Sequence, residues 1–411
     1  GLNFASGAQS VATADALLSK LSSQPGSLAL APVELAGWSA RNLGIDGIYP
    51  AQGRGDPTKY IFPPLTLKLG VAQALATRGL NARALAGWLS PLLAGATATL
   101  DMVVSGDIIL GRGVNVKMVA YNDYLYPYRK VRDEFMSADY RVANLECTIS
   151  DLVPIPTDPS TFTFITASKA VDGLVYAGIQ AVTVANNHSN NGGDAAFVDM
   201  LGNLNRHNIA VFGGGNNVAQ ARAPYVHTVK GVRIALLGYN NIPPGGPYAG
   251  PDSPGIAYID TDTLPQDIAV ARAQADIVIP YFHWGIEYTK DPTQYQQQIS
   301  HTAIDAGADM VLGSHPHWVQ AMESYKGKLI VYALANFIFD QDWSEATQEG
   351  FMIHLYWRGT TLAGIRFVPT LIMDRCQPNI MTPTQAVGVF GRMWSGSDLL
   401  AGGQYGPEYE P

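Results

Sequence analysis

Short apolar runs rich in valine and isoleucine recur through the middle of the chain. They lie at residues 102–106, 140–143, 181–185, 277–280 and 308–312. Each run has about the length of a buried strand, and the segments between the runs are long enough for helices. Repeated strand–helix units of this kind place parallel strands beside one another, so the pattern predicts an α/β fold.

The segments between and after these runs predict the other elements. Apolar positions at helical spacing predict helices at residues 128–137, 168–176, 193–207, 267–275 and 294–306. Two later strand-like runs, at residues 351–356 and 362–369, are separated by a turn and predict an antiparallel pair that extends a sheet edge. The glycine-rich, acidic stretch after Ser395 is expected to cover little of the protein.

A residue that can bind a metal follows each of the five runs. In chain order these residues are Asp107, Glu146, the pair Asn187 and His188, His283, and the closely spaced His315 and His317. A single histidine is more often structural than a ligand, so the prediction rests on the repetition. Because the carboxyl ends of parallel strands meet at one edge, we expect these side chains to converge there. Carboxylates, a carboxamide and imidazoles together suit Zn, Mn or Fe better than Ca or Mg.

Composition and charge bear on what the protein binds and where it is located. A formal net charge of -8, with 26 Lys and Arg among 411 residues, argues against a nucleic-acid-binding surface. The chain starts at Gly1 rather than Met, which a removed signal or lipid-anchor segment would explain, and a shortened chain is the alternative. The abundance of Gly, Pro and Tyr beside few charges favours an extracytoplasmic protein, secreted or at the cell surface.

The two cysteines, Cys147 and Cys376, leave two alternatives open. In an oxidising compartment they could pair, and closing so long a loop would stabilise the fold by roughly 5 kcal/mol. The other alternative is a pair of unbonded, buried thiols. Sequence does not place the two sulfur atoms together, so it does not decide between them.

Six short motifs, taken together and in order, resemble one known family. They lie at residues 106–110, 144–146, 186–188, 283–288, 313–317 and 335–337. They closely resemble the poly-γ-glutamate capsule-synthesis family, usually called CapA, which is similar to the calcineurin-like metallophosphoesterases. The resemblance implies a metallophosphoesterase-like β-sandwich flanked by helices, formed by residues 98–379. Residues 1–97 would be a small α+β segment resembling the end of a solute-binding module, and residues 380–411 a C-terminal tail.

The resemblance also implies a role for each candidate residue. The implied metal ligands are Asp107, Glu146, Asn187, His283, His315 and His317, which would hold one or two divalent Mn, Zn or Fe ions, and His188 is the implied catalytic acid. Ile109 stands where the phosphoesterase motif has a histidine, and Glu146 is one methylene longer than the usual aspartate. We therefore expect two metal positions of unequal affinity, the weaker one at Asp107, Glu146 and His317.

Three function classes fit these features. The first is a metal-dependent hydrolase acting on a phosphoester or on an extracellular anionic polymer such as poly-γ-glutamate. The second is a non-catalytic, metal-bound accessory or polymer-binding protein, and the third is a structural surface protein on the same fold. The ligand set favours the first class, and Ile109 favours the second. The expected partners are the polymer, membrane-associated capsule-synthesis proteins and further copies of the chain.

Overall fold

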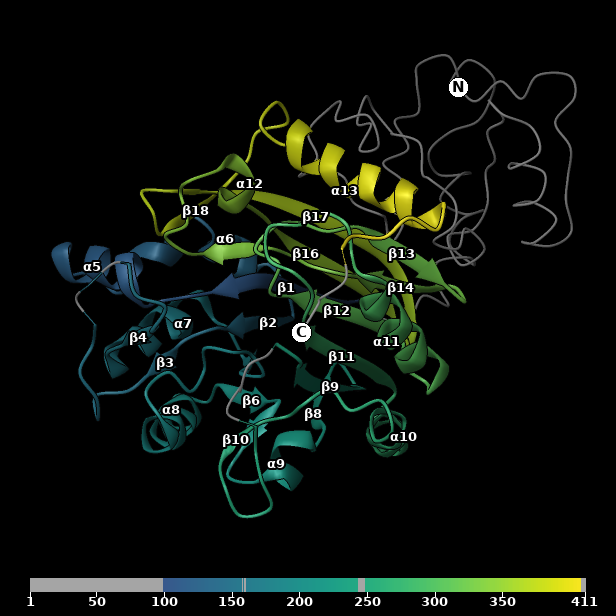
Figure 1. Ribbon diagram of the computed structural model, residues 1–411, viewed down its shortest axis with the longest axis horizontal. Helices are drawn as coiled ribbons and strands as arrows, with labels where there is room; N and C mark the ends of the chain where they lie inside the picture. The colour runs from purple at the N-terminus through teal and green to yellow at the C-terminus, as the bar shows by residue number, and fades with distance from the viewer. Residues whose placement is uncertain (1–98, 157, 159, 243–247, 408–411) are drawn as a thin grey trace, which may run out of the picture.

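The computed structural model describes residues 99–156, 158, 160–242 and 248–407. Within these residues two β-sheets stack on each other, with α5 to α8 on one outer side and α10 and α11 on the other (Figure 1). The expected segment 1–97 lies outside the described residues. Among the described helices, none combines the length and the apolar character needed to cross a membrane.

The first sheet joins the earliest predicted strands to the late antiparallel strands. Its order is β18-β17-β16-β1-β2-β5-β6, and β15 also pairs with β1. The strands are β1 (Thr99–Ile108), β2 (Tyr140–Leu145), β5 (Ala181–Thr183), β6 (Ala210–Phe212), β15 (Asn336–Ile338), β16 (Glu349–Arg358), β17 (Thr361–Met373) and β18 (Gln377–Ile380). The pairs from β1 to β6 are parallel, whereas β16, β17 and β18 are antiparallel additions. The predicted antiparallel pair at a sheet edge is therefore confirmed.

The second sheet has the order β13-β14-β12-β11-β9-β8. Its strands are β8 (Tyr225–Val229), β9 (Val232–Asn240), β11 (Ile277–His283), β12 (Met310–Ser314), β13 (Met322–Tyr325) and β14 (Lys328–Val331). The four inner strands β9, β11, β12 and β14 are parallel. Two small pairs lie outside the sheets, β3 (Thr148–Ile149) with β4 (Ile165–Thr166) and β7 (Gly214–Gly215) with β10 (Gly255–Ile256).

The described helices are α5 (Arg112–Ala120), α6 (Arg132–Met136), α7 (Val171–Ala177), α8 (Asp194–Arg206), α9 (Val218–Arg222), α10 (Leu264–Gln274), α11 (Gln294–Asp305), α12 (Glu345–Gln348) and α13 (Val387–Ala401), with 3₁₀ turns η3 (Tyr126–Tyr128) and η4 (Ser168–Ala170). Of these, α6, α7, α8, α10 and α11 match predicted helices with shorter or shifted bounds, whereas α5, α9, α12 and α13 were not predicted. Local chemistry sets several ends. Thr293 and Gln296 form a capping box at the start of α11, and Gly178, at φ 72°, ends α7 in the left-handed conformation.

Alternation along the strands fills three apolar layers. On β1, Val103 packs toward the α5–α8 side, whereas the next residue, Val104, packs between the sheets. On β11, Val278 packs toward α10 and α11, whereas Ile279 packs between the sheets. Successive strand residues point to opposite faces, so strands buried on both sides produce continuous apolar runs. The expected β-sandwich flanked by helices is confirmed.

Two expectations about the end of the chain and the cysteines need comment. Residues 396–401, in the stretch expected to cover little, belong to helix α13 (Figure 1). Phe390 and Leu400 of this helix are buried. Cys147 and Cys376 are both buried and free, which matches the alternative of two unbonded thiols. Burial raises the pKa of each thiol to about 12.

Candidate metal centre

The structure brings the six predicted metal ligands to one edge, where parallel strands of both sheets end. Asp107 lies near the end of β1, Glu146 follows β2, and Asn187 follows β5, all from the first sheet. The second sheet supplies the three histidines: His283 ends β11, and His315 and His317 follow β12. Two stacked sheets thus contribute oxygen ligands from one side and imidazoles from the other.

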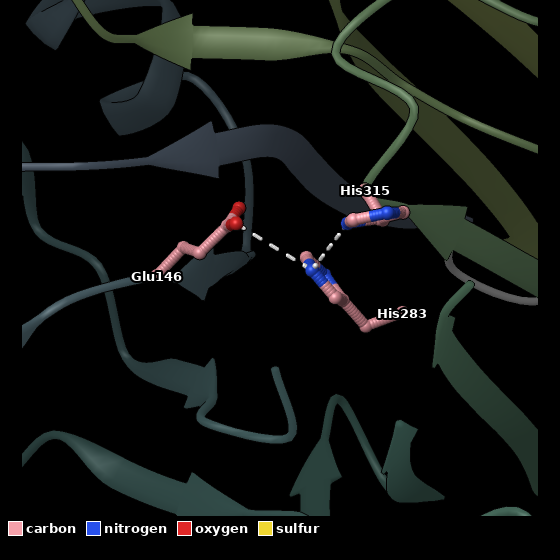
Figure 2. A group of neighbouring side chains, drawn as sticks. All are labelled: Glu146, His283 and His315. Atoms are coloured by element: carbon pink, nitrogen blue, oxygen red, sulfur yellow. Dashed lines mark hydrogen bonds and ion pairs between the residues drawn. The ribbon is translucent and has the colours of Figure 1, made fainter. Parts of the chain in front are cut away.

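Four of these residues surround one point, which we call position A. The His283 Nε2 atom lies 2.8 Å from Asn187 Oδ1, 3.2 Å from His315 Nδ1 and 3.5 Å from Glu146 Oε1. Figure 2 shows the rings of His283 and His315 and the carboxylate of Glu146 turned toward one another. Ligands bound about 2.1 Å from a tetrahedral ion lie roughly 3.4 Å apart, so these separations fit one shared ion.

A second point, position B, lies among Asp107, Glu146 and His317. One ligand atom from each of the three lies within 4.8 Å of the others, and all three side chains are buried. The His317 ring approaches Asp107 Oδ2 to 3.7 Å through its Nδ1 atom, so the imidazole lies beside that carboxylate. Glu146 therefore belongs to both positions, as a carboxylate that bridges two ions would.

The donor atoms suit a cation. Glu146 Oε1 is buried and makes no hydrogen bond within the described part of the chain. A buried carboxylate oxygen without a partner is costly, and a bound cation would remove that cost. The three histidines and two carboxylates form the mixed nitrogen and oxygen set that Zn, Mn and Fe prefer.

Burial keeps the three histidines in the state that binds metal. It lowers the pKa of His283 to about 4 and that of His317 to about 3, and it lowers the pKa of His315 well below the usual value. At neutral pH all three rings are uncharged. Neutral imidazole is the form of histidine that donates its lone pair to a metal.

The two carboxylates behave in the opposite way. Burial, and next the charge of Glu146, raise the pKa of Asp107 to about 7. Burial also raises the pKa of Glu146 well above its ordinary value. Two buried carboxylates that repel each other are the arrangement that a divalent cation would stabilise.

Asn144 and Ser314 position Asp107, and the sequence did not mark either as functional. The Asn144 amide donates to Asp107 Oδ1 at 2.9 Å, and the Ser314 hydroxyl donates to the same oxygen. Asn186 in turn donates to Asn144 Oδ1 at 3.0 Å and so fixes the orientation of that amide. Their positions in the sequence could have identified them, because Asn144 lies two residues before the ligand Glu146 and Ser314 directly precedes the ligand His315.

Asn336 fixes the ring of His317. Its Oδ1 atom lies 2.8 Å from His317 Nδ1, and its amide nitrogen donates to the Thr347 carbonyl at 2.8 Å. Because that carbonyl can only accept, the amide oxygen is the atom that faces His317, and His317 Nδ1 must donate. The other ring nitrogen, Nε2, keeps its lone pair for a metal.

The loops that carry the second-sheet ligands have unusual backbone conformations. His315, His317 and Tyr288 have positive φ angles of 97°, 58° and 61°. A Cβ on Gly313 would lie 2.0 Å from the Tyr332 carbonyl oxygen, so this position tolerates no side chain. Non-glycine residues held in the left-handed region cluster at functional sites.

His188, the predicted acid, lies beside the ligands in a partly buried position. Its ring packs against Phe164 with 4.2 Å between centroids, and its Nδ1 atom is 3.0 Å from Asn191 Oδ1. That oxygen also accepts the Phe164 amide, at 2.7 Å, so His188 Nδ1 is the donor of the pair. Burial lowers the pKa of His188 to about 4.

The model described as "Bacterial capsule synthesis protein PGA_cap" matches residues 101–341, more than half of the chain. The chain is similar to the PGA biosynthesis protein CapA of Bacillus subtilis (strain 168), with 32% identity over 258 residues, 62% of this chain and 67% of that protein. It is 29% identical over 282 residues to the capsule biosynthesis protein CapA of Bacillus anthracis, which covers 67% of this chain and 68% of that protein.

More distant similarities extend to other bacteria. A probable polyglutamine synthesis accessory protein of Mycobacterium tuberculosis is 23% identical over 301 residues, 61% of this chain and 77% of that protein. Among solved structures, the NAD nucleotidase of Haemophilus influenzae gives a TM-score of 0.43 at 12% identity, covering 71% of this chain and 56% of that chain. A 5'-nucleotidase precursor from Thermus thermophilus gives 0.38 at 11% identity, covering 74% and 59%. At TM-scores below 0.5 these structures carry no inference about activity.

Proposed function

We propose that this chain, which belongs to the PGA_cap family of bacterial capsule synthesis proteins, carries a metal-dependent hydrolase site that acts in the synthesis or processing of an anionic extracellular polymer. The observation that carries the proposal is the shared carboxylate of Glu146, which lies in both groups of ligand atoms. A shared carboxylate would hold two ions close together, and two such ions would stabilise both the attacking and the leaving oxygen of a substrate.

The chain's own residues would divide the work. Divalent ions at positions A and B would supply an activated water and neutralise negative charge on the substrate. Asn144 and Ser314 hold Asp107 in place by hydrogen bonds, and Asn336 orients His317. His188, fixed through Asn191, would give a proton to the leaving oxygen.

The names of the relatives support the substrate class. Two relatives are named for biosynthesis of PGA or of the capsule, so poly-γ-glutamate or a related polymer is the substrate class that we propose. Such a polymer lies outside the cytoplasm, which agrees with the extracytoplasmic location expected from composition. Membrane-associated capsule-synthesis proteins are the partners that this location would bring within reach.

The test is hydrolysis by metal-reconstituted protein. The chain would be stripped with a chelator, reloaded with Mn or Zn, and assayed on phosphomonoesters, phosphodiesters and poly-γ-glutamate. We expect turnover that requires metal and that is lost in Glu146→Gln. Glu345→Gln is the matched control, because Glu345 is an exposed glutamate at the start of α12. Metal-loaded protein without turnover on any of these substrates would contradict the hydrolase.

A non-catalytic accessory protein is the second candidate. The specific observation in its favour is Ile109, which is fully buried, belongs to an apolar cluster and offers no ligand atom to position B. The Mycobacterium tuberculosis relative is itself named as an accessory protein. Metal-dependent binding of poly-γ-glutamate without cleavage, measured by co-sedimentation and by polymer length, would favour this candidate.

A further inference from the structure

Position B has fewer ligands than position A. Position A collects Glu146, Asn187, His283 and His315, whereas position B has one ligand atom each from Asp107, Glu146 and His317. Since Ile109 supplies none, an ion at position B would depend on three protein ligands or on a further residue. Asn144, Ser314 and Asn336 are already hydrogen-bonded to the ligands themselves, and the three further candidates are Asn186, Cys147 and Glu287.

Two of these three are already engaged or unsuited. The Asn186 amide nitrogen donates to Asn144 Oδ1 and to the Leu145 carbonyl, and its oxygen accepts the His188 amide. Cys147 is fully buried in the apolar cluster under α5 to α8, where burial raises its thiol pKa to about 12. A thiol binds metal as thiolate, so Cys147 is a poor candidate.

Glu287 has the position to serve, and the hydrogen bond that its carboxylate accepts from the Tyr288 hydroxyl leaves further lone pairs for an ion. Its Oε1 atom lies 4.0 Å from His317 Nε2, the ring nitrogen that Asn336 leaves free. Two ligands held about 2.1 Å from one ion are at most about 4.2 Å apart, so this separation allows a shared ion without moving His317. The Glu287 side chain is 42% exposed, so its carboxylate can also rotate toward the ion.

We propose that Glu287 is the ligand that completes position B and takes the place left empty by Ile109. The inference rests on the proposed function, because it assumes that metal occupies the site. It also links the two positions along the chain, since His283 at the end of β11 would serve position A and Glu287, four residues later in the following loop, position B. This short segment would then couple the occupancy of both positions.

The backbone around Glu287 supports such a role. The Tyr288 amide donates to the Pro316 carbonyl at 2.8 Å, which ties the Glu287 loop to the loop that carries His317. The Tyr288 hydroxyl accepts a hydrogen bond from Gln341 at 3.1 Å, and Gln341 accepts one from Asn336 at 3.1 Å. The same network therefore holds His317 and the residue next to Glu287 in a fixed relation.

The experiment is a Mn(II) titration of the metal-free chain, monitored by electron paramagnetic resonance of the free ion. We expect the unmodified chain to bind two equivalents, the second more weakly than the first. Glu287→Gln should weaken the second equivalent by about tenfold or more and leave the first unchanged. Glu345→Gln, the exposed control, should leave both equivalents unchanged. Circular dichroism of each variant checks that the fold is intact.

The outcomes separate this inference from the proposed function. Two equivalents with unchanged affinities in Glu287→Gln would overturn the role of Glu287 while leaving the metal site in place. A single equivalent in the unmodified chain would overturn it as well, and would leave a mononuclear hydrolase. If the unmodified chain bound no Mn(II) and no Zn(II), the proposed function itself would fail. A second equivalent weakened only in Glu287→Gln would support the inference.

Discussion

The Nε2 atom of His283 lies 3.2 Å from the Nδ1 atom of His315, although 32 positions separate these residues in the chain. The parallel pairing of β11 with β12 produces this contact, because it sets His283 opposite Ser314, the residue before His315. Both rings are neutral at pH 7, so each carries a proton on only one of its two nitrogens. The two nitrogens that face each other can therefore both offer lone pairs. A shared cation satisfies both nitrogens at once.

His315→Ala should therefore remove the ion from position A. We expect the metal content after dialysis to fall by about one equivalent, measured by inductively coupled plasma mass spectrometry. His207→Ala is the control, because His207 is an exposed histidine that follows α8. Equal metal content in His315→Ala and the unmodified protein would show that His315 is not a ligand.

The shared position of Glu146 gives a different signature. Glu146→Gln keeps the size of the side chain and removes its charge, so both equivalents should bind more weakly in a Mn(II) titration. His317→Ala, in contrast, should weaken only the second equivalent, because His317 belongs to position B alone. Loss of a single equivalent in Glu146→Gln would argue against a bridging carboxylate.

His188 can be tested by turnover and by its pH dependence. His188→Ala should lower turnover by roughly a hundredfold and leave metal content unchanged, as expected for loss of a general acid. Because burial lowers the pKa of His188 to about 4, its acid form is rare at pH 8 and more abundant at pH 6. Turnover limited by this proton should rise by about tenfold per pH unit between pH 8 and 6. The same slope in His188→Ala would assign the proton to another group.

The sequence predicted the ligands well because strand ends are a local feature. An apolar run that stops at a polar residue is visible without any tertiary information, and parallel pairing then brings Asp107 and Glu146 to one edge. The match to the PGA_cap family confirms the family resemblance drawn from the six motifs. The arrangement into two sheets was not predictable in this way, because strand periodicity does not say which strands share a sheet.

The end of the chain was misjudged for a local reason. Gly396, Gly402 and Gly403 made the stretch after Ser395 look unlike a helix, although Phe390, Met393 and Leu400 follow helical spacing. Packing outweighed the low helix propensity of glycine, because the side chains of Phe390 and Met393 fill one end of the core between the sheets. The hydrogen bond from Ser314 to Asp107 was missed because it crosses between the two sheets, and the one from Asn144 was missed because it depends on the register of β1 with β2.

The packing of α13 gives a stability prediction. Phe390 is 1% exposed, and its ring centroid lies 5.3 Å from that of Phe351 and 6.0 Å from that of Phe367. Phe390→Ala should lower the free energy of unfolding by about 3–5 kcal/mol, measured by urea denaturation. Val387→Ala on the same helix should change it by less than about 0.5 kcal/mol, because Val387 is 47% exposed. Equal effects of the two changes would mean that α13 does not pack as described.

Because the pKa of Asp107 is raised, the free energy of unfolding of the metal-free protein should depend on pH. A carboxyl with a pKa of about 7 in the folded protein destabilises the fold when it is ionised. The free energy of unfolding is therefore lowered most above pH 7, and this effect disappears below the unfolded pKa of about 3.9. At about 1.4 kcal/mol per pKa unit, metal-free Asp107→Asn should be more stable than the unmodified chain by about 2–4 kcal/mol at pH 8. The amide oxygen can still accept from Ser314 and Asn144, so those hydrogen bonds persist.

Urea denaturation of chelator-treated protein compares Asp107→Asn with the unmodified chain. Their free energies of unfolding should differ at pH 8 and agree at pH 4. With metal bound the order should reverse, because Asp107→Asn weakens position B and loses the stabilisation that a bound ion gives to the folded state. A variant less stable than the unmodified chain in both conditions would show that Asp107 acts through its hydrogen bonds to Ser314 and Asn144. Reversal of the order on adding metal would instead show that its buried charge is kept for a cation.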